Sequence, residues 1–554
     1  MHTPDLDISP APAPSNRLIP LLALMISTLA ILVRAWMAWR THYTGEDALI
    51  TLRYAENLAS GHGFVFNPGE RVLGTTTPLY TLLLALFAWL HLDAMMVGKA
   101  CNILADGVTC FLVAKTLARR EIGQPILGLF AALFYAFDTL PISISISGME
   151  TAMVTCASLG AIYAYLARRE IPLYVLGALL FLLRIDTLPL FAILAVALAL
   201  QTQRISWRAL GYGLLLLLPW LVFATVYFGS PLPASLLAKL TAYGHPTLTP
   251  AKSISAVNRA NFLNLFAQGW IQRGVSALFL VGVWGILSPQ RTQRDTERRE
   301  KQENDPQITA DYRRLQTRGV NVFRKEETVS FFSLCPSVSS VVKSSPLVAP
   351  MLWLLLYYGV MFFAWVPTFR WYFLPPMPLF LVIAAVGAGR LVSGRVGQGI
   401  ARVMAQRQRL AWGAALAACS ILGLVHLRGI VHDVVRLQEF NDAQLRPIGE
   451  WLGAQVRSDE RILLEPIGYI GYYSRRNLLD EIGLVSPEVL PSYRTDAPLE
   501  DMIKRFRPEW LCLRKDEELR LNASRTYAFV ANYRLVRQFA VPNATTYVIY
   551  RRNE

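Results

Sequence analysis

The segment Thr44–Tyr80 reads TGEDALITLRYAENLASGHGFVFNPGERVLGTTTPLY, and the arrangement of the whole chain can be worked out from it. It follows the apolar run Leu18–Trp39, which is long enough to cross a bilayer, since a crossing takes about twenty residues. Two adjacent carboxylates, Glu46 and Asp47, stand near its start, and polar, Gly-rich and aromatic residues fill the remainder. Because charges are costly in hydrocarbon, the segment is expected to lie at a membrane surface.

The composition is that of an integral membrane protein. Of the 554 residues, 53% are hydrophobic, and the mean hydropathy is +0.35, too apolar for an ordinary soluble protein. The net charge of +15 does not indicate a nucleic-acid partner, because the basic residues collect in short loops between apolar runs, as in cytoplasmic loops of membrane proteins. The six cysteines show neither a disulfide framework nor a metal-ligand spacing.

Segment lengths and flanking charges predict the topology at the start of the chain. Residues 1–17 are predicted to be a cytoplasmic leader, and Leu18–Trp39 then crosses outward. The first extracytoplasmic loop covers residues 41–94. Its apolar run Pro78–Leu92 is short for a span and begins with a proline, which suits the first position of a helix.

The choice between a crossing and a surface helix for Pro78–Leu92 depends on the next span. Met95–Ala118 ends in Arg119 and Arg120. These arginines are cytoplasmic only if Pro78–Leu92 does not cross, so we interpret Pro78–Leu92 as a juxtamembrane or re-entrant helix. Within Met95–Ala118, polar residues stand at helical spacing and are expected to face the bundle interior: Lys99, Asn102 and Asp106.

Further apolar runs alternate across the membrane, which gives about eleven spans within residues 18–427. One of them, Pro125–Ile144, is interpreted as a single outward crossing. Residues 288–346 interrupt the alternation with dense charge and no apolar period. They are predicted to be a disordered cytoplasmic insert.

After the last span the composition changes, and residues 428–554 are predicted to be a small extracytoplasmic α/β domain. Helices are expected near Pro498–Arg507 and Ala523–Tyr533. The expected strands are Arg461–Glu465, Trp510–Arg514, Leu535–Ala540 and Thr546–Arg551. The predicted fold class is therefore mainly α: a polytopic transmembrane helical bundle with a small C-terminal α/β domain.

The acidic pair Glu46 and Asp47 allows two interpretations. The pair alone could cap a helix, because acidic residues favour helix N-termini. However, polar side chains are predicted on the same side of the membrane, and we expect most of them to face one cavity as substrate-binding residues: Arg53, Asn57, Glu150, Arg184, Asp186, Lys239, Arg370 and Tyr372.

Such a cavity offers a general base for an acceptor hydroxyl and cations for a phosphate leaving group. One acid would accept the proton, and the other would orient a side chain, a hydroxyl or a divalent metal ion. Two of the cations have alternative roles. Arg370 lies between aromatic residues and could be an interfacial anchor, and Arg184 could form an ion pair with Asp186 that closes a turn.

Several nucleotide-binding and hydrolase motifs are missing from the sequence. There is no Walker A motif, no G-x-G-x-x-G between a strand and a helix, no H-E-x-x-H and no G-x-S-x-G. The D-x-D at Asp5–Asp7 falls in the leader. These absences argue against a cytosolic nucleotide donor.

The first-loop segment from Glu46 to Tyr80 resembles the signature of the GT-C superfamily of glycosyltransferases, in particular its bacterial arabinofuranosyltransferase-like branch. The similarity covers nearly the whole chain except residues 288–346. Later blocks that resemble the same branch are SGMET (Ser147–Thr151), LLRID (Leu182–Asp186), SPLPASLLAK (Ser230–Lys239), RWYFLPPMPLF (Arg370–Phe380) and IGYIGYYSRRNLLDEIGLVSPE (Ile467–Glu488).

The resemblance implies a polytopic inverting glycosyltransferase of the inner membrane. It would take a sugar from a polyprenyl-phosphate carrier on the extracytoplasmic face and pass it to a glycan, lipid or protein acceptor. An acidic residue of the first loop would serve as base or orient the acceptor, which points to Glu46 or Asp47. This sequence has Glu46 where the branch has Asp, and Leu73-Gly74-Thr75 where it often has Glu-Gly-Tyr, so both acids remain candidates.

Two other classes of function remain open at this point. A transporter or flippase for a lipid-linked glycan would place its site near the midplane on broken helices, often in inverted repeats, and no such repeat is visible. A non-catalytic scaffold is the other class. It would be favoured if the acidic pair were buried in a network away from any cavity.

Overall fold

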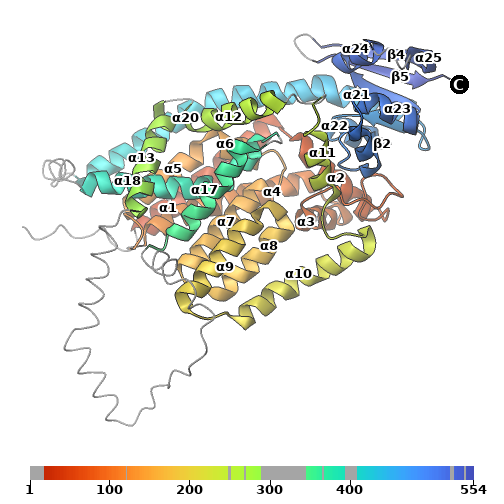
Figure 1. Ribbon diagram of the computed structural model, residues 1–554. Helices are drawn as coiled ribbons and strands as arrows, with labels where there is room; N and C mark the ends of the chain where they lie inside the picture. The colour runs from red at the N-terminus through yellow and green to blue at the C-terminus, as the bar shows by residue number, and fades with distance from the viewer. Residues whose placement is uncertain are drawn as a thin grey trace, which may run out of the picture.

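The computed structural model describes residues 18–119, 121–246, 251–267, 270–287, 345–364, 367–393, 408–523, 529–541 and 545–553. The predicted leader and almost all of the predicted insert at residues 288–346 lie outside the described residues. Within them, a bundle of helices leads into a small domain with a five-stranded sheet (Figure 1). The predicted fold class, a mainly α bundle followed by a small α/β domain, is confirmed.

Apolar helices of two lengths build the bundle. In the described part of the chain, five are long and apolar enough to cross a membrane: α1 (Leu18–Thr41), α4 (Ala94–Leu117), Ile185–Thr202 with α9 (Leu188–Thr202), α10 (Trp207–Phe228) and Trp412–Gln455. Shorter apolar helices pack with them: α3 (Pro78–Trp89), α7 (Thr151–Leu166), α8 (Glu170–Leu183), α13 (Trp270–Leu287), α17 (Val348–Phe363) and α18 (Met377–Ser393). The chain is a multi-pass membrane protein, and the total of about eleven spans remains a prediction.

The run predicted as one outward crossing, Pro125–Ile144, is bent. Helices α5 (Pro125–Phe137) and α6 (Thr139–Ser145) meet at an angle of 56°. The break occurs at Asp138, whose side chain accepts the backbone N–H of Leu140 at 2.9 Å and caps α6. Asp138 starts a new helix, so the run is either a broken span or a re-entrant segment, and the single outward crossing stays a prediction.

A buried ion pair fixes this break to the neighbouring helices. Arg34 of α1 lies 2.5 Å from Asp106 of α4, and both side chains are fully buried. The guanidinium also donates to the carbonyl of Ala136 at 2.9 Å, near the C-terminal end of α5. Tyr135 donates its hydroxyl to Asp106 at 2.5 Å. One network thus joins α1, α4 and α5, and it satisfies a backbone carbonyl at the helix end.

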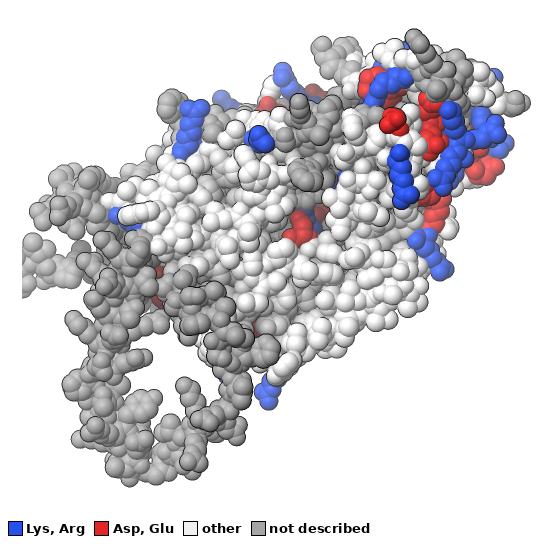
Figure 2. Space-filling view, viewed as in Figure 1, with Lys and Arg blue, Asp and Glu red and all other residues white. Residues whose placement is uncertain are grey.

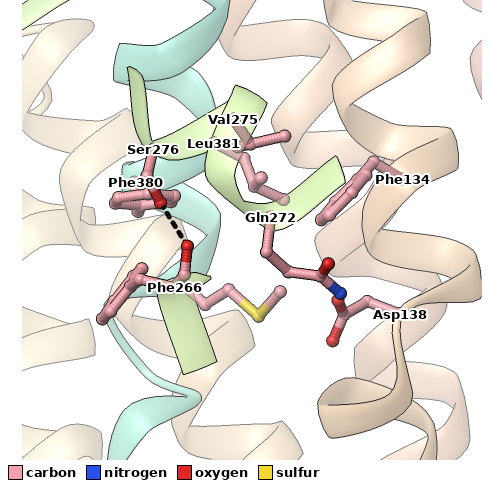
Figure 3. Close-up of a pocket in the computed structure, with 9 residues that line it drawn as sticks. Phe134, Asp138, Phe266, Gln272, Val275, Ser276, Phe380 and Leu381 are labelled. Atoms are coloured by element: carbon pink, nitrogen blue, oxygen red, sulfur yellow. Dashed lines mark hydrogen bonds between the residues drawn. The ribbon is translucent and has the colours of Figure 1, made fainter. Parts of the chain in front are cut away.

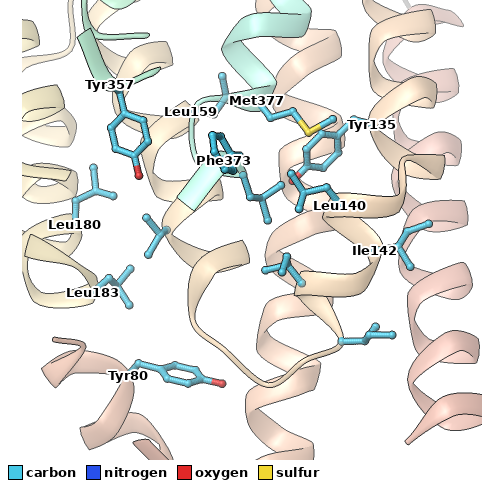
Figure 4. Close-up of a cluster of buried hydrophobic side chains, with 14 of the residues drawn as sticks. Tyr80, Tyr135, Leu140, Ile142, Leu159, Leu180, Leu183, Tyr357, Phe373 and Met377 are labelled. Carbon is cyan, nitrogen blue, oxygen red and sulfur yellow. The ribbon is translucent and has the colours of Figure 1, made fainter. Parts of the chain in front are cut away.

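The prediction for the interior of α4 is confirmed, since Lys99, Asn102 and Asp106 are all buried. Lys99 donates to the carbonyl of Tyr43 at 2.5 Å, which ties this helix to the start of the first loop. Figure 4 shows large side chains of the core, among them Tyr80 and Phe373, enclosed by helices of the bundle. The same apolar cluster continues into the C-terminal domain, where it includes Trp510.

The C-terminal sheet has the strand order β2-β1-β3-β5-β4. Strand β1 (Arg461–Leu464) pairs in parallel with β2 (Asn477–Asp480) and β3 (Trp510–Arg514). Strand β5 (Tyr547–Arg552) pairs antiparallel with β3 and with β4 (Tyr533–Phe539). All four predicted strands are confirmed. Strand β2 was not predicted.

The helices of this domain agree less well with the prediction. Helix α23 (Pro498–Phe506) is confirmed. The helix predicted over Ala523–Tyr533 is confirmed in part: α25 (Phe529–Asn532) lies within it, residues 524–528 lie outside the described residues, and Tyr533 opens strand β4. Tyrosine is enriched in strands, and Tyr533 pairs with Arg552 of β5.

A long helix connects the bundle to the sheet. Helix α20 (Gln408–Phe440) continues through a π-helical turn at Asn441–Leu445 into α21 (Arg446–Gln455), and it passes through residue 428, where we placed the domain boundary. In Figure 1 it runs along one side of the bundle as far as the sheet. In the view of Figure 2, charged side chains gather on the end that carries the sheet, and they are sparser over the helices. That distribution suits a bundle in lipid and a domain in water.

Candidate active site

A partly open cleft of about 560 Å³ lies between the bundle and the C-terminal domain. Its walls come from α2 (Glu46–Ala59), the end of the first loop, α11 (Ala234–Ala242) and the turn Arg370–Phe373. The lining residues are Asp47, Ile50, Thr51, Gly74, Thr75, Thr76, Thr77, Met149, Glu150, Arg184, Ser235, Lys239, Trp371, Tyr372 and Leu484. Segments far apart in the sequence therefore meet at one polar cleft.

Asp47 is the acid of the first-loop pair that lines the cleft. It occupies the first turn of α2 and is half-buried. Burial raises the pKa of Asp47 above its ordinary value, and the positive charges of Lys239 and Arg184 partly oppose that rise. The result is a carboxylate whose proton affinity is higher than that of a free aspartate.

Glu46 points elsewhere, although it is the adjacent residue. Its carboxylate accepts the backbone N–H groups of Gly468 at 2.6 Å and Tyr469 at 3.0 Å. Burial raises the pKa of Glu46 to about 8, against the opposing effect of the hydrogen bond from Tyr469. Consecutive side chains on a helix lie about 100° apart, so the two acids of α2 face different neighbours. Glu46 thus holds the C-terminal domain against the first loop.

Lys239 is a cation of the cleft that forms no ion pair within the described residues. Its Nζ donates to the hydroxyl of Tyr372 at 3.4 Å. Burial by itself would lower the pKa of Lys239, but Tyr372 and Asp47 outweigh that effect and raise it. Lys239 therefore remains protonated.

Arg184 is the second cation, and two carboxylates engage it. Its guanidinium binds Asp186 through two contacts of 3.0 and 2.7 Å and lies 3.6 Å from Glu150. It also lies over the ring of Tyr372, 4.8 Å from the ring centre. Burial raises the pKa of Glu150, and Arg184 opposes the rise. Of the two interpretations of Arg184 and Asp186, the mutual ion pair is present, and Arg184 lines the cleft as well.

Four of the predicted substrate-binding residues lie outside the cleft lining. Arg370 is exposed and does not line it, although the next two residues in the sequence do. Arg53 is buried, and its guanidinium donates to the carbonyls of Gly471 at 2.6 Å and Arg476 at 2.7 Å. Asn57 donates to two carbonyls within the first loop, those of residues 65 and 66, each at 2.9 Å. Asp186 lies behind Arg184 and is also not part of the lining.

The two most specific sequence motifs, the first loop and Ile467–Glu488, dock onto each other. Asn67 accepts the backbone N–H of Leu478 at 3.1 Å and donates to its carbonyl at 2.8 Å, at the edge of β2. Glu56 accepts the hydroxyl of Tyr472 at 2.7 Å. A Cβ on Gly74 would lie 2.6 Å from the carbonyl oxygen of Leu484, so this contact requires glycine. Most charged and amide residues of the signature therefore build an interdomain joint.

Sequence reasoning missed several residues of the cleft. Thr51, Thr75, Thr76, Thr77 and Ser235 carry no charge and were not singled out. Leu484 reaches the cleft from the C-terminal domain, in which no cleft residue was predicted. The signal that could have found it is the presence of two specific motifs far apart in one chain.

A second cavity of about 330 Å³ lies between α5, α13 and α18, and most of its lining is apolar (Figure 3). Asp138 and Gln272 lie at one end of it, and Ser276 donates to the carbonyl of Phe266 at 2.9 Å. It presents a carboxylate and no cation among its lining residues, so it does not suit a phosphate group.

Among the described residues, no group of three or more His, Cys, Asp or Glu side chains could hold a metal ion.

Comparisons with known proteins give the following similarities. A family profile described as a domain of unknown function, DUF8728, matches residues 435–550. The terminal β-(1→2)-arabinofuranosyltransferase of Mycobacterium tuberculosis is 29% identical over 245 residues, which cover 39% of this chain and 38% of that protein. A protein of the same name from Corynebacterium glutamicum is 42% identical over 53 residues, 10% of this chain and 8% of that protein. The matched regions thus span well under half the length of these relatives.

Solved structures with a similar course of the chain include those of ArnT from Cupriavidus metallidurans. The structure bound to undecaprenyl phosphate has a TM-score of 0.48 at 12% identity, with 95% of this chain and 97% of that chain covered. The apo structure of the same protein has a TM-score of 0.47 at 12% identity, with the same coverage.

Proposed function

We propose that this protein is a membrane glycosyltransferase of the GT-C type. It would transfer a sugar from a polyprenyl-phosphate carrier to a glycan, lipid or protein acceptor of the cell envelope. The observation that carries the proposal is the cleft itself, in which the carboxylate of Asp47 lies with Lys239 and Arg184 at the junction of an apolar bundle and a polar domain. The similarity to proteins named arabinofuranosyltransferases supports the same class of reaction.

In this proposal Asp47 is the general base. It accepts the proton of an acceptor hydroxyl as the oxygen attacks the anomeric carbon of the donor sugar. The bond between that carbon and the phosphate oxygen breaks, and its electron pair stays on the phosphate. The raised pKa of Asp47 favours proton acceptance, because a more basic carboxylate is a stronger acceptor.

Lys239 would hold the departing phosphate. It is protonated, lines the cleft and forms no ion pair within the described chain, so its charge is available to an anion. Arg184 is already paired with Asp186 and Glu150, and it would add a second, partly compensated charge beside the phosphate. Glu46 would act as a positioning residue, because it fixes the start of α2 against the C-terminal domain.

The proposed orientation places the cleft and the C-terminal domain outside the cytoplasm. At one end of α4, Lys99 contacts Tyr43 of the first loop. At the other end, Arg119 donates to the carbonyl of Leu166 at 2.9 Å, just before Arg168 and Arg169. Basic residues thus cluster opposite the cleft, as the positive-inside rule expects for the cytoplasmic side.

The proposal is tested by transfer of radiolabelled sugar from a polyprenyl-phosphate donor in proteoliposomes. The wild-type protein should form labelled product, and Asp47→Asn should lower turnover by about 10²- to 10⁴-fold, the usual contribution of a general base. Flux of the lipid-linked sugar across the bilayer without any product would instead indicate a transporter. Wild-type turnover by Asp47→Asn would exclude the stated mechanism.

A further inference from the structure

Ser235 has a buried hydroxyl that nothing in the described chain satisfies. Its side chain lines the cleft and is only 2% exposed. Its Oγ has no hydrogen-bond partner among the described residues. Of the buried side-chain atoms in that condition, the Ser235 Oγ is the one that belongs to the cleft.

The position of Ser235 in α11 explains why its hydroxyl is free. A serine inside a helix usually donates to the carbonyl four residues earlier. Helix α11 begins at Ala234, so for Ser235 that carbonyl belongs to Pro231, outside the helix. The backbone N–H of Ala234 donates instead to the carbonyl of Leu73 at 2.8 Å, which anchors the helix start to the first loop. The serine hydroxyl is therefore held at the cleft without an internal partner.

A buried hydroxyl without a partner is costly, and such groups in native proteins usually meet a ligand or an ordered water. The surroundings of Ser235 indicate the ligand's chemistry. The cleft also presents the neutral hydroxyl residues Thr51, Thr75, Thr76 and Thr77, and two of these hydroxyls, those of Thr75 and Thr77, lie 3.0 Å apart. Neutral hydroxyl groups that can both donate and accept suit the hydroxyls of a sugar, whereas an anion is held best by cations.

We propose that Ser235 is a sugar-binding residue, an inference that rests on the proposed function. Its hydroxyl donates to an oxygen of a sugar ring, one helical turn before Lys239 on the same helix. Residues 235 and 239 lie on one face of α11, so one helix presents a neutral donor and a cation side by side. The sugar belongs either to the donor or to a glycan acceptor, and both offer the same chemistry.

The test uses the full-length protein in proteoliposomes with Ser235→Ala. We expect the KM of one sugar-bearing substrate to rise about three- to tenfold, the loss of one neutral hydrogen bond. A rise confined to the lipid-linked donor assigns the contact to the donor sugar, and a rise confined to a glycan acceptor assigns it to the acceptor. Binding of polyprenyl phosphate that carries no sugar should stay at the wild-type level, whereas Lys239→Met should weaken it.

Ser158→Ala is the matched control, because Ser158 is also a buried serine without a partner in the described chain and it does not line the cleft. Its KM values should equal those of the wild type, and neither variant should lower the melting temperature. Unchanged KM values in Ser235→Ala would overturn the inference, as would an equal loss of affinity for sugar-free polyprenyl phosphate. Full turnover by Asp47→Asn would instead overturn the proposed function, so the two failures give different results.

Discussion

At the residue scale, two neighbouring acids have different surroundings. Asp47 lines the cleft with Lys239 and Arg184, whereas Glu46 binds two backbone N–H groups of the C-terminal domain. The sequence alone left both acids open as the base. The phase of helix α2 separates them, because it turns one side chain into the cleft and the next toward Gly468.

The pH dependence follows from the direction of the Asp47 pKa. A general base must be deprotonated, so kcat/KM should fall as the pH drops through this pKa. Burial raises the pKa of Asp47 above the ordinary 3.8, so the loss should begin at a higher pH than for a free aspartate. A pH profile of kcat/KM measures the midpoint directly. A profile that stays flat through the range where carboxylates titrate would argue against proton acceptance by Asp47.

At the element scale, polar side chains determine where a helix breaks, and helix propensity alone does not. The apolar run Pro125–Ile144 has the length of a span, and its 56° bend lies at Asp138, a charged residue inside the run. Asp138 caps the second half, and Arg34 satisfies a carbonyl at the end of the first. The second half leads to Met149 and Glu150 of the cleft, so the bend delivers residues to the site.

The ion pair between Arg34 and Asp106 should be essential for this arrangement. Arg34→Met leaves Asp106 as an unpaired buried charge and should destabilise the protein by about 3–5 kcal/mol. The double variant Arg34→Met with Asp106→Leu removes both charges and should recover part of the loss. Thermal unfolding in detergent compares the two. Equal stability of the Arg34→Met variant and the wild type would contradict the role assigned to the pair.

The joint between the first loop and strand β2 gives a second test at this scale. Asn67→Ala removes both hydrogen bonds to the backbone of Leu478, and about 1–3 kcal/mol of local stability should be lost for each unsatisfied buried group. Hydrogen exchange at the Leu478 amide should then accelerate. Asn477→Ala is the control, because the hydrogen bond from the Asn477 side-chain amide to the carbonyl of Ser458 lies at the surface. Unchanged protection at Leu478 would mean that Asn67 does not hold the strand.

At the scale of the whole molecule, hydropathy and charge predicted the helical bundle and the composition shift predicted the small α/β domain. They could not predict the joint between the two parts, because pairing of Arg53, Glu56 and Asn67 with the C-terminal domain depends on long-range contacts. The same limit explains the site. Polarity and the predicted side of the membrane singled out five residues that line one cleft in the structure: Asp47, Glu150, Arg184, Lys239 and Tyr372.

Some residues that were predicted to face the cavity do not line the cleft in the structure. These residues share one feature. All four are polar, but direction within a turn or helix decides what they contact: Arg53, Asn57, Asp186 and Arg370. Tyr372 lines the cleft, whereas Arg370, two residues earlier, is exposed. Ser235 shows the opposite case, since a neutral residue in an apolar helix gives no signal until its burial is known.

A comparison of turnover by Asp47→Asn and Glu46→Gln, with a radiolabelled polyprenyl-phosphate sugar, decides whether Asp47 or Glu46 is the base. Both changes replace a carboxyl group by an amide and keep the size of the side chain. We expect a loss of about 10²- to 10⁴-fold in kcat for Asp47→Asn. The loss for Glu46→Gln should be much smaller, because its amide oxygen still accepts one of the two N–H groups. Near wild-type turnover in Asp47→Asn together with an inactive Glu46→Gln would contradict the account.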